Sequence, residues 1–268
     1  MTLHAEVTGS GPPLVLLHGF TGSVATWEPA RALLAARHRV VAIDLPGHGG
    51  SPAPDGGLPR VAHQLLGTLD RLGIERASWL GYSLGGRAAL HVALARPDRI
   101  DRLVLESTSP GLADAAARAA RASADDVLAR RLEREGLEPF ADAWMAQPLF
   151  ATQRRLTPDL LTRERALRLG HDPARLAAAL RAMGAGRQAS LWDRLPALRL
   201  PTLVVAGEDD HQYRAIAAAM MARLPDARVA VIPDAGHAVH LENPVPFWSM
   251  VEAFLALPMA ERVEGAAP

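Results

Sequence analysis

A serine flanked by glycines is the strongest chemical signal in the sequence. Residues 81–85 read GYSLG, after a short apolar run and before a run with helical spacing. This context is typical of a nucleophile elbow, a sharp strand-to-helix turn that exposes a serine hydroxyl. Glycine is needed two positions to either side because the turn brings neighbouring backbone close, where a Cβ atom would clash. The pattern predicts a reactive hydroxyl on Ser83; the alternative is an ordinary structural turn.

A serine hydroxyl is a weak nucleophile until a positioned base accepts its proton, so a histidine partner is required. Of the ten histidines, His237 is the best placed, in the sequence DAGH just after the last strand-like run. A loop at that position can return the imidazole over Ser83. His240, three residues further along the chain, is the nearest alternative.

The imidazole in turn needs a carboxylate that fixes its tautomer and stabilises its charge. Asp209 and Asp210 lie in the turn after the strand-like run 203–206 and precede the histidine in the chain order serine, acid, histidine. Spacing alone does not separate these two aspartates. Glu106, at the end of an earlier strand-like run, is a third candidate.

Two backbone N–H groups can complete this chemistry. The turn after the first strand-like run, in the sequence LHGF, can direct the N–H of Phe20 toward the site, beside the N–H of Leu84. Two converging donors form an oxyanion hole, in which each donor often contributes ~3 kcal/mol to transition-state stabilisation. The alternative for the LHGF segment is a plain strand-to-loop turn.

Arg87 lies four residues after Ser83, on the same face of the predicted helix. A cation in the first turn of a helix opposes the helix dipole at a cost of ~0.3 to 1 kcal/mol, so its placement indicates a functional reason. Guanidinium groups bind carboxylates through two parallel hydrogen bonds. We therefore expect an anionic small-molecule substrate near Ser83.

Short apolar runs bounded by glycine and proline alternate with helical stretches and predict the elements that position these groups. The runs cover residues 14–17, 40–43, 79–81, 103–105, 203–206 and 229–232, and helices are expected over 87–95 and 214–223. Their length and flanks favour buried parallel strands. The predicted fold class is α/β, a mostly parallel sheet with helices on both faces. Functional groups in such sheets collect at the carboxyl ends of the strands.

The alternation stops between residues 111 and 192, where the chain is rich in alanine, arginine and leucine with helical spacing. We predict a helical cap over 111–192, inserted into a core formed by 1–110 and 193–268. The cap carries more arginines than acidic residues, although the whole chain has a formal net charge of zero.

Composition excludes several function classes. Basic and acidic residues are equal in number, at 29 each, so no overall field favours nucleic acid or an anionic membrane. The absence of cysteine removes disulfides, thiolate metal sites and cysteine nucleophiles. Neither a signal peptide nor a membrane span is expected, so a cytoplasmic location is predicted. No metal, organic cofactor, protein partner or particular oligomeric state is predicted.

The sequence resembles the α/β-hydrolase superfamily over essentially the whole chain, and within it the 2-succinyl-6-hydroxy-2,4-cyclohexadiene-1-carboxylate synthases of menaquinone biosynthesis. The segments that carry this resemblance are 18–22 (HGFTG), 44–51 (DLPGHGGS), 81–87 (GYSLGGR), 144–150 (WMAQPLF) and 183–192 (MGAGRQASLW). The first two are widespread in the superfamily, whereas the arginine of GYSLGGR and the two segments from the cap are more specific. In this family the acid is the third residue after the glycine of its turn, which selects Asp210.

The resemblance also implies substrate-binding residues and a reaction. Two cap arginines, Arg121 and Arg168, would join Arg87 in holding carboxylates, although Arg118, Arg163 and Arg165 are close in sequence. Tyr82 and Trp144 would line the pocket. The implied reaction is the elimination of pyruvate from 2-succinyl-5-enolpyruvyl-6-hydroxy-3-cyclohexene-1-carboxylate, without hydrolysis.

The triad itself leaves two other function classes open, because the same geometry serves many chemistries. A carboxylesterase or carbon–carbon bond hydrolase would use the same residues through an acyl-enzyme. A non-catalytic ligand-binding receptor would have no need of all three triad residues.

Overall fold

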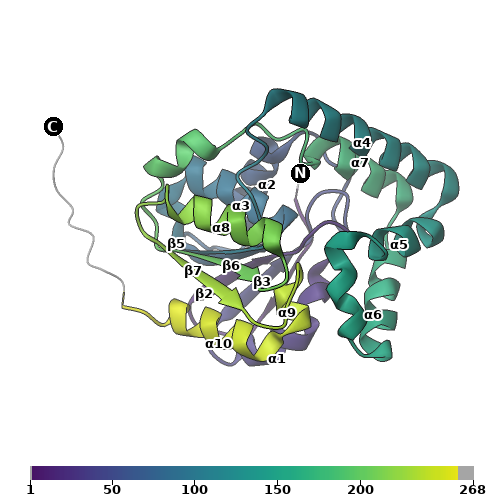
Figure 1. Cartoon of the computed structure of the whole chain (residues 1–268). Helices are drawn as coiled ribbons and strands as arrows, with labels where there is room; N and C mark the ends of the chain where they lie inside the picture. The colour runs from purple at the N-terminus through teal and green to yellow at the C-terminus, as the bar shows by residue number, and fades with distance from the viewer. Residues whose placement is uncertain (1, 259–268) are drawn as a thin grey trace.

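A computed structural model describes residues 2–258 and contains a seven-stranded sheet in the order β1-β3-β2-β4-β5-β6-β7 (Figure 1). The strands are β1 Ala5–Thr8, β2 Pro13–Leu17, β3 Arg39–Ile43, β4 Ala77–Tyr82, β5 Ile100–Glu106, β6 Thr202–Gly207 and β7 Ala227–Ile232. The predicted α/β class is confirmed, as are all six predicted strands. Every pairing is parallel except that of β1 with β3. The sequence analysis missed β1, because this strand is only partly buried and has no apolar run.

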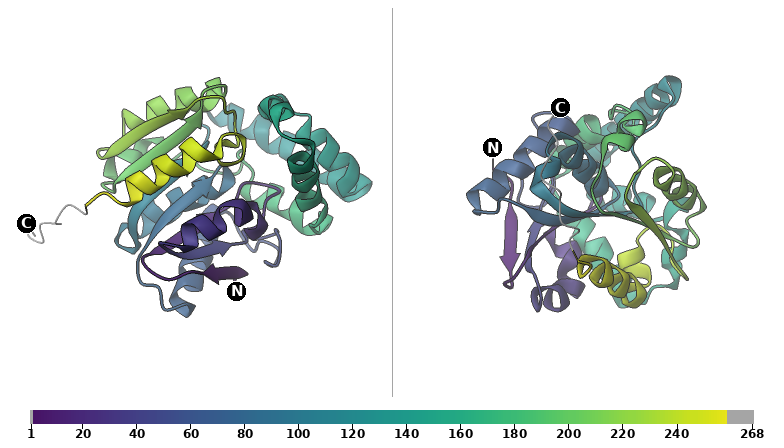
Figure 2. Two further views of the ribbon diagram at one scale, coloured as in Figure 1. Left: turned by 90° about the horizontal axis from the view of Figure 1, so that it is seen from below. Right: turned by 90° about the vertical axis from the view of Figure 1, so that its left-hand side faces the viewer.

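Helices cover both faces of the sheet (Figures 1 and 2). The first face carries α2 Leu58–Arg71, α3 Leu84–Ala95 and α8 His211–Met221; the second carries α1 Glu28–Ala35 and α10 Pro244–Leu255. Successive strand residues alternate between two cores, as Val15 and Leu17 lie in the first and Leu14 and Leu16 in the second. The predicted helices 87–95 and 214–223 correspond to α3 and α8, which begin three residues earlier.

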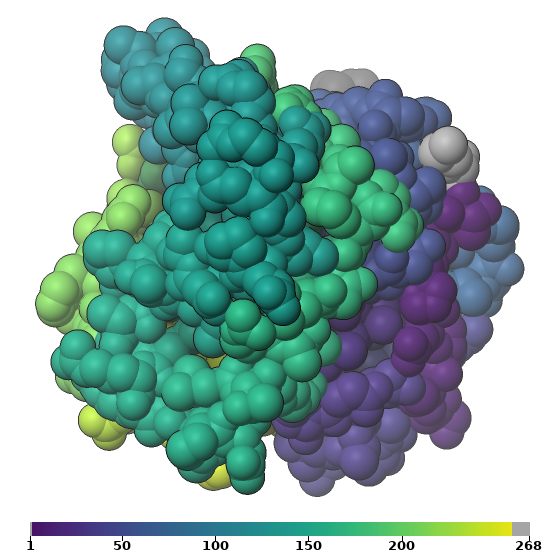
Figure 3. Space-filling model, turned by 90° about the vertical axis from the view of Figure 1, so that its right-hand side faces the viewer, coloured from purple at the N-terminus to yellow at the C-terminus, as the bar shows by residue number. Residues whose placement is uncertain are grey.

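The regular structure between β5 and β6 is entirely helical. It contains α4 Ala115–Glu135, α5 Leu137–Met145, α6 Pro158–Leu169 and α7 Pro173–Met183, joined in part by the 3₁₀ segment Pro148–Arg155. Its own small core includes Leu132, Phe140 and Leu176. These helices cover one side of the molecule, shown in teal and green beside the purple N-terminal region (Figure 3).

The two ends of this helical segment lie together, because the N–H of Leu191 donates to the carbonyl of Pro110 over 2.8 Å. The limits 1–110, 111–192 and 193–268 stay a prediction, and residues 259–268 of that last range lie outside the described residues. No helix within residues 2–258 is long and apolar enough to cross a membrane. The carboxyl ends of β2, β4, β5 and β6 all lead into loops that reach the site described next.

Candidate active site

The turn at Ser83 has the backbone of a nucleophile elbow. Ser83 has φ 50° and ψ −107°, an unfavourable conformation for a residue with a side chain. Its N–H donates to the carbonyl of Glu106 over 2.9 Å, and its own carbonyl accepts from the hydroxyl of Thr108 over 2.7 Å. Bonds to a neighbouring strand end thus hold the strained turn in place.

The two glycines of the elbow are required by close backbone contacts. A Cβ atom on Gly81 would lie 2.5 Å from the backbone of Gly85, and one on Gly85 would lie 2.1 Å from the carbonyl oxygen of Leu17. Both distances are far below any real Cβ contact. The glycine pattern that predicted the turn therefore has the expected steric cause.

The structure brings Ser83, His237 and Asp210 into one hydrogen-bonded chain. The Nε2 atom of His237 is 3.3 Å from the Ser83 Oγ atom, and its Nδ1 atom is 2.8 Å from the Asp210 Oδ2 atom. His237 and Asp210 are 2% and 7% exposed, so bulk water does not screen their interaction. The serine–histidine contact is longer than the histidine–aspartate contact, and contacts of this kind often reach their shortest length only in the transition-state complex.

Asp210 has both carboxylate oxygens engaged. It is the N-cap of α8, where its Oδ1 atom accepts the backbone N–H of Tyr213 over 3.1 Å, while Oδ2 faces His237. The helix N-terminus stabilises the negative charge of the aspartate. The acid turn and the histidine turn pack tightly, since a Cβ atom on Gly207 would lie 2.2 Å from the carbonyl oxygen of Gly236.

The alternative acids have other partners. Asp209 pairs with Arg155 of the helical segment, with 2.7 Å between its Oδ2 atom and the arginine Nη1 atom. Glu106 is fully buried and accepts a hydrogen bond from His240 Nδ1 over 2.8 Å. Burial opposes protonation of His240, but the charge of Glu106 and this hydrogen bond together raise its pKa above the ordinary value. The Glu106 and His240 side chains thus form a separate buried pair, and neither side chain is hydrogen-bonded to the side chain of Ser83 or His237.

Both residues predicted to supply the oxyanion donors, Phe20 and Leu84, lie at the cavity that contains Ser83. Leu84 is the first residue of α3, so its N–H has no partner within the helix. Phe20 and Leu84 both line the cavity that contains Ser83 and His237. The turn that carries Phe20 runs against the elbow, since a Cβ atom on Gly19 would lie 2.6 Å from the ring of Tyr82.

A buried carboxylate fixes the loop that contains Phe20. Asp44, which is 1% exposed, accepts hydrogen bonds from the N–H groups of Val24 and Gly50 over 2.7 and 2.8 Å. The Nδ1 atom of His18 donates to the carbonyl of Gly19, and its Nε2 atom accepts the N–H of Leu45. Desolvation of the buried ring lowers the pKa of His18 to about 4, so it is neutral at pH 7.

The cavity above Ser83 has a volume of about 120 Å³ and lies between the sheet edge and the helical segment. Its lining brings together the candidate triad base, the elbow, two arginines and a group of aromatic rings. These residues include Phe20, Tyr82, Ser83, Arg87, Arg121, Trp144, Gln147, Phe150, Met183, Tyr213 and His237. A lining that combines arginines with aromatic rings fits an organic anion.

No carboxylate within residues 2–258 forms an ion pair with Arg87. Its Nη1 atom donates to the carbonyl of Met183 over 2.8 Å and to Oε1 of Gln188 over 3.2 Å, both neutral acceptors. Desolvation lowers the pKa of Arg87 to about 10; the charge of Arg121 acts in the same direction, whereas Tyr213 and the charge of Asp125 oppose the shift. Arg87 therefore stays cationic at neutral pH and lies in the cavity without a directly bonded carboxylate.

The other two predicted arginines each have an internal partner. Arg121 lines the Ser83 cavity, is about half exposed, and pairs with Asp125 over 2.8 Å. Arg168 does not line that cavity. It pairs with Glu164 over 3.0 Å and is 7% exposed. The structure thus brings Arg87 and Arg121 to the site and places Arg168 beside it.

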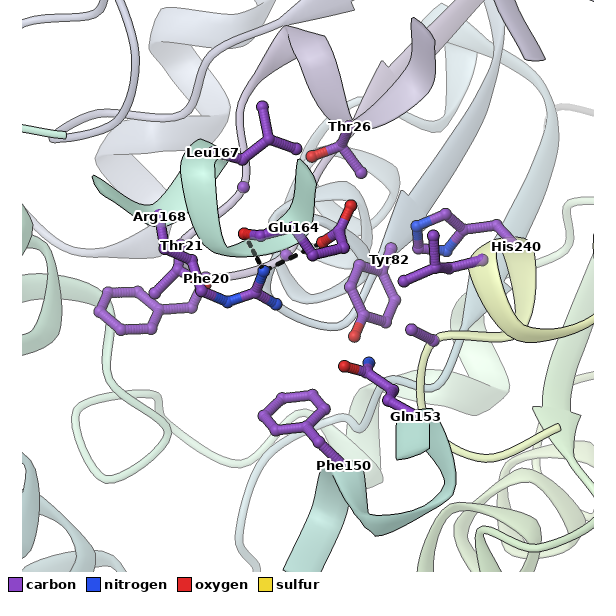
Figure 4. A pocket seen from close by; sticks show the side chains of 14 residues that line it. Phe20, Thr21, Thr26, Tyr82, Phe150, Gln153, Glu164, Leu167, Arg168 and His240 are labelled. Atoms are coloured by element: carbon purple, nitrogen blue, oxygen red, sulfur yellow. Dashed lines mark hydrogen bonds and ion pairs between the residues drawn. The ribbon is translucent and has the colours of Figure 1, made fainter. Parts of the chain in front are cut away.

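Arg168 lines a second, smaller cavity of about 30 Å³ that shares Phe20, Tyr82 and Phe150 with the first (Figure 4). In this view the guanidinium group points between Phe20 and Tyr82 and is bonded to Glu164. Its Nε atom is buried without a hydrogen-bond partner in the described part of the chain, as is Oε1 of Gln153. The volume is close to that of one water molecule.

Tyr82 and Trp144 lie where the resemblance implied. The Tyr82 ring centre is 5.6 Å from that of His237, and burial raises the pKa of its hydroxyl well above the ordinary value. Trp144 lies edge-on to Phe20, with 5.1 Å between ring centres. Its buried indole N–H has no hydrogen-bond partner among residues 2–258.

Sequence reasoning missed several residues at the site. Tyr213 lies against His237, with 4.6 Å between ring centres, and Phe150 lies on another side of the same imidazole at 5.9 Å. Gln188 holds Arg87. Phe150 and Gln188 fall inside segments 144–150 and 183–192, which were noted for their resemblance but not for individual side chains. Within the described residues, no group of histidine and carboxylate side chains could hold a metal ion.

Comparisons with known proteins agree with this geometry. Residues 12–244 match the family model described as the alpha/beta hydrolase fold. A putative 2-succinyl-6-hydroxy-2,4-cyclohexadiene-1-carboxylate synthase of Bacillus subtilis (strain 168) is 39% identical over 254 residues, 93% of this chain and 92% of that protein. The synthase of Salmonella heidelberg (strain SL476) is 39% identical over 91% of this chain and 95% of its own. The solved structure of MenH from S. aureus has a TM-score of 0.90 at 33% identity, covering 94% and 97% of the two chains.

The sheet order, the elbow and the serine–histidine–aspartate chain define a protein of the α/β-hydrolase class. Within that class the chain belongs to the family of 2-succinyl-6-hydroxy-2,4-cyclohexadiene-1-carboxylate synthases, a family of enzymes.

Proposed function

We propose that the protein eliminates pyruvate from 2-succinyl-5-enolpyruvyl-6-hydroxy-3-cyclohexene-1-carboxylate and releases 2-succinyl-6-hydroxy-2,4-cyclohexadiene-1-carboxylate, a step of menaquinone biosynthesis. The observation that carries the proposal is Arg87, a partly buried cation that forms no ion pair with a carboxylate within residues 2–258, in the same cavity as Ser83. A cavity built for a neutral ester would have no use for such a charge. The family to which the chain belongs supplies the particular substrate.

Proton removal begins the reaction. Ser83 takes the ring proton next to the succinyl carbonyl, and its own hydroxyl proton passes to Nε2 of His237, 3.3 Å away. Asp210 stabilises the imidazolium that forms, through its 2.8 Å contact with Nδ1. The proton next to a ketone is acidic enough for this base because the resulting charge spreads onto the carbonyl oxygen.

The developing oxyanion lies between the N–H groups of Phe20 and Leu84 in this proposal. A donor that meets the charge only in the transition state lowers the barrier, often by ~3 kcal/mol. The dienolate electrons then move through the ring and break the bond between the ring carbon and the enolpyruvyl oxygen. The leaving group departs as the enolate of pyruvate, which takes up one proton and becomes pyruvate.

Arginine placement orients the substrate. Arg87 would hold one carboxylate by two parallel hydrogen bonds, and Arg121, partly neutralised by Asp125, would hold a second from the cavity rim. Arg168 would contribute only if its pair with Glu164 opened, because that pair occupies the guanidinium in the structure. Tyr82 and Trp144 would contact the ring of the substrate. No metal or organic cofactor enters these steps, and a cytoplasmic location remains part of the proposal.

Ester or carbon–carbon bond hydrolysis by the same three residues is the competing function. The two differ in how Ser83 acts, since hydrolysis requires a covalent acyl-enzyme and a water molecule, whereas elimination requires neither.

The test is pyruvate formation from the enolpyruvyl substrate, followed with lactate dehydrogenase and NADH. Purified protein should release pyruvate far faster than the uncatalysed background and should hydrolyse neutral esters poorly. Background-level pyruvate together with rapid ester hydrolysis would overturn the proposal in favour of the hydrolase.

A further inference from the structure

Gln188 lies directly behind Arg87, on the return of the chain from the helical segment to the sheet. It is 4% exposed, and its amide is packed beside Gly111, where a Cβ atom would lie 3.2 Å from Nε2. Because a guanidinium group only donates hydrogen bonds, the amide oxygen must be the end that faces Arg87. The observed contact, 3.2 Å from Arg87 Nη1 to Gln188 Oε1, has this orientation.

Stability alone does not favour a glutamine here. The Nε2 atom of Gln188 is buried without a hydrogen-bond partner among residues 2–258, which is unfavourable for a polar group. An apolar side chain of similar length would avoid that loss. We therefore expect that position 188 needs a side chain that accepts a hydrogen bond from Arg87.

The acceptor is also neutral. Arg121 and Arg168 both pair with carboxylates, Asp125 and Glu164, whereas Arg87 is held by a backbone carbonyl and an amide. A carboxylate at position 188 would orient the guanidinium equally well but would compete with the substrate for its charge. A neutral acceptor fixes the direction of Arg87 and leaves its charge available.

We propose that Gln188 is a positioning residue that orients Arg87 toward the substrate carboxylate while keeping that arginine uncompensated. This inference rests on the proposed function, because it gives Arg87 an anionic ligand. It makes Gln188 a determinant of affinity for anions, although its side chain need not touch the substrate.

Two substitutions separate orientation from charge. Gln188→Glu keeps the acceptor and adds a negative charge, so the KM for the anionic substrate should rise roughly tenfold or more. The dependence of kcat/KM on ionic strength should become less steep, because the cavity has lost one unit of attracting charge. Gln188→Met removes the acceptor and keeps the charge, so kcat/KM should fall severalfold with the salt dependence unchanged.

The readouts also exclude a merely structural role. A folding defect alone would lower the melting temperature of both variants without changing the salt dependence of either. Gln64→Glu is the control for burying a carboxylate elsewhere, since Gln64 is 5% exposed, lies in α2 and does not line the cavity. Its Nε2 atom donates to Asp55 over 2.9 Å, so this substitution should lower the melting temperature. That control should leave KM and its salt dependence unchanged.

The proposal would be overturned if Gln188→Glu had the same KM and the same salt dependence as the wild-type protein. If Gln188→Glu does not fold, an unchanged kcat/KM in Gln188→Met would overturn it. Failure of the proposed function gives a different result, namely no pyruvate release by the wild-type protein. In that case the comparison is repeated with succinate binding, measured by calorimetry on the same variants. Equal succinate affinity in wild type and Gln188→Glu then counts against Gln188 as well.

Discussion

Replacing Arg87 by methionine removes the one arginine charge of the Ser83 cavity that has no carboxylate partner in the described structure, at nearly constant apolar volume. The guanidinium is oriented by two hydrogen bonds and is partly buried, so water replaces its contacts only in part. Hydrogen bonds to charged groups contribute ~1.5 to 3 kcal/mol each, and a bidentate carboxylate contact has two. A loss of about 3 kcal/mol predicts a fall of roughly a hundredfold in kcat/KM for the anionic substrate.

The assay is pyruvate release at several substrate concentrations, with hydrolysis of a neutral ester as the comparison. Arg87→Lys keeps the charge without the planar fork, so its loss should be intermediate. Arg121→Met should cost less than tenfold, because Arg121 is half exposed and already paired with Asp125. If Arg87→Met stays within threefold of wild type, or loses equal activity on both substrates, the reasoning about an uncompensated cation is refuted.

Three further predictions follow from single contacts. Asp210→Asn should lower turnover by ~10³-fold or more with little change in melting temperature. Glu106→Gln should lower the melting temperature and keep most of the activity. The reverse pattern would make Glu106 the catalytic acid in place of Asp210. Burial lowers the pKa of His18 from 6.5 to about 4, so as the pH falls the unfolded chain binds a proton at this histidine before the folded protein does. The free energy of unfolding should therefore decrease as the pH drops below 6.5, by about 2 kcal/mol at pH 5. Equal urea midpoints at pH 7 and pH 5 would contradict this. Gly85→Ala should lower the free energy of unfolding by ~2 to 4 kcal/mol and abolish activity, because the added carbon would collide with the Leu17 carbonyl. Gly67→Ala is the control: its added carbon would have no atom nearer than 3.9 Å, so its thermal melt should resemble that of the wild-type protein.

Six strands could be predicted from the sequence because each forms an apolar run, and five of them, β2 to β6, are largely buried on both faces. β1 escaped that reasoning because it lies at the sheet edge, half exposed and antiparallel to its neighbour. The starts of α3 and α8 were placed late. Both helices begin directly after a site residue, Ser83 and Asp210, where the chain turns sharply and shows no apolar periodicity yet.

Spacing identified the residue types of the candidate site but not every choice among them. Only the family pattern separated Asp210 from Asp209, and their different partners become visible in three dimensions. The ion pair between Arg168 and Glu164 could be predicted from the sequence, because the two residues are four positions apart on one helix. The position of the Arg168 guanidinium relative to Tyr82 could not, because it depends on how the helical segment packs on the sheet. Gln188 could not be found in advance, since its contact with Arg87 joins residues 101 apart in sequence.

The central claim is that Ser83 acts as a base in an elimination and forms no covalent intermediate. The most direct measurement is a single turnover with enzyme in excess over the enolpyruvyl substrate, quenched at successive times and analysed for pyruvate and for the intact mass of the protein. Elimination should give one pyruvate per substrate, an unmodified protein mass at every time point, and no pyruvate from Ser83→Ala. A transient mass increase located on Ser83, or normal turnover by Ser83→Ala, would contradict it.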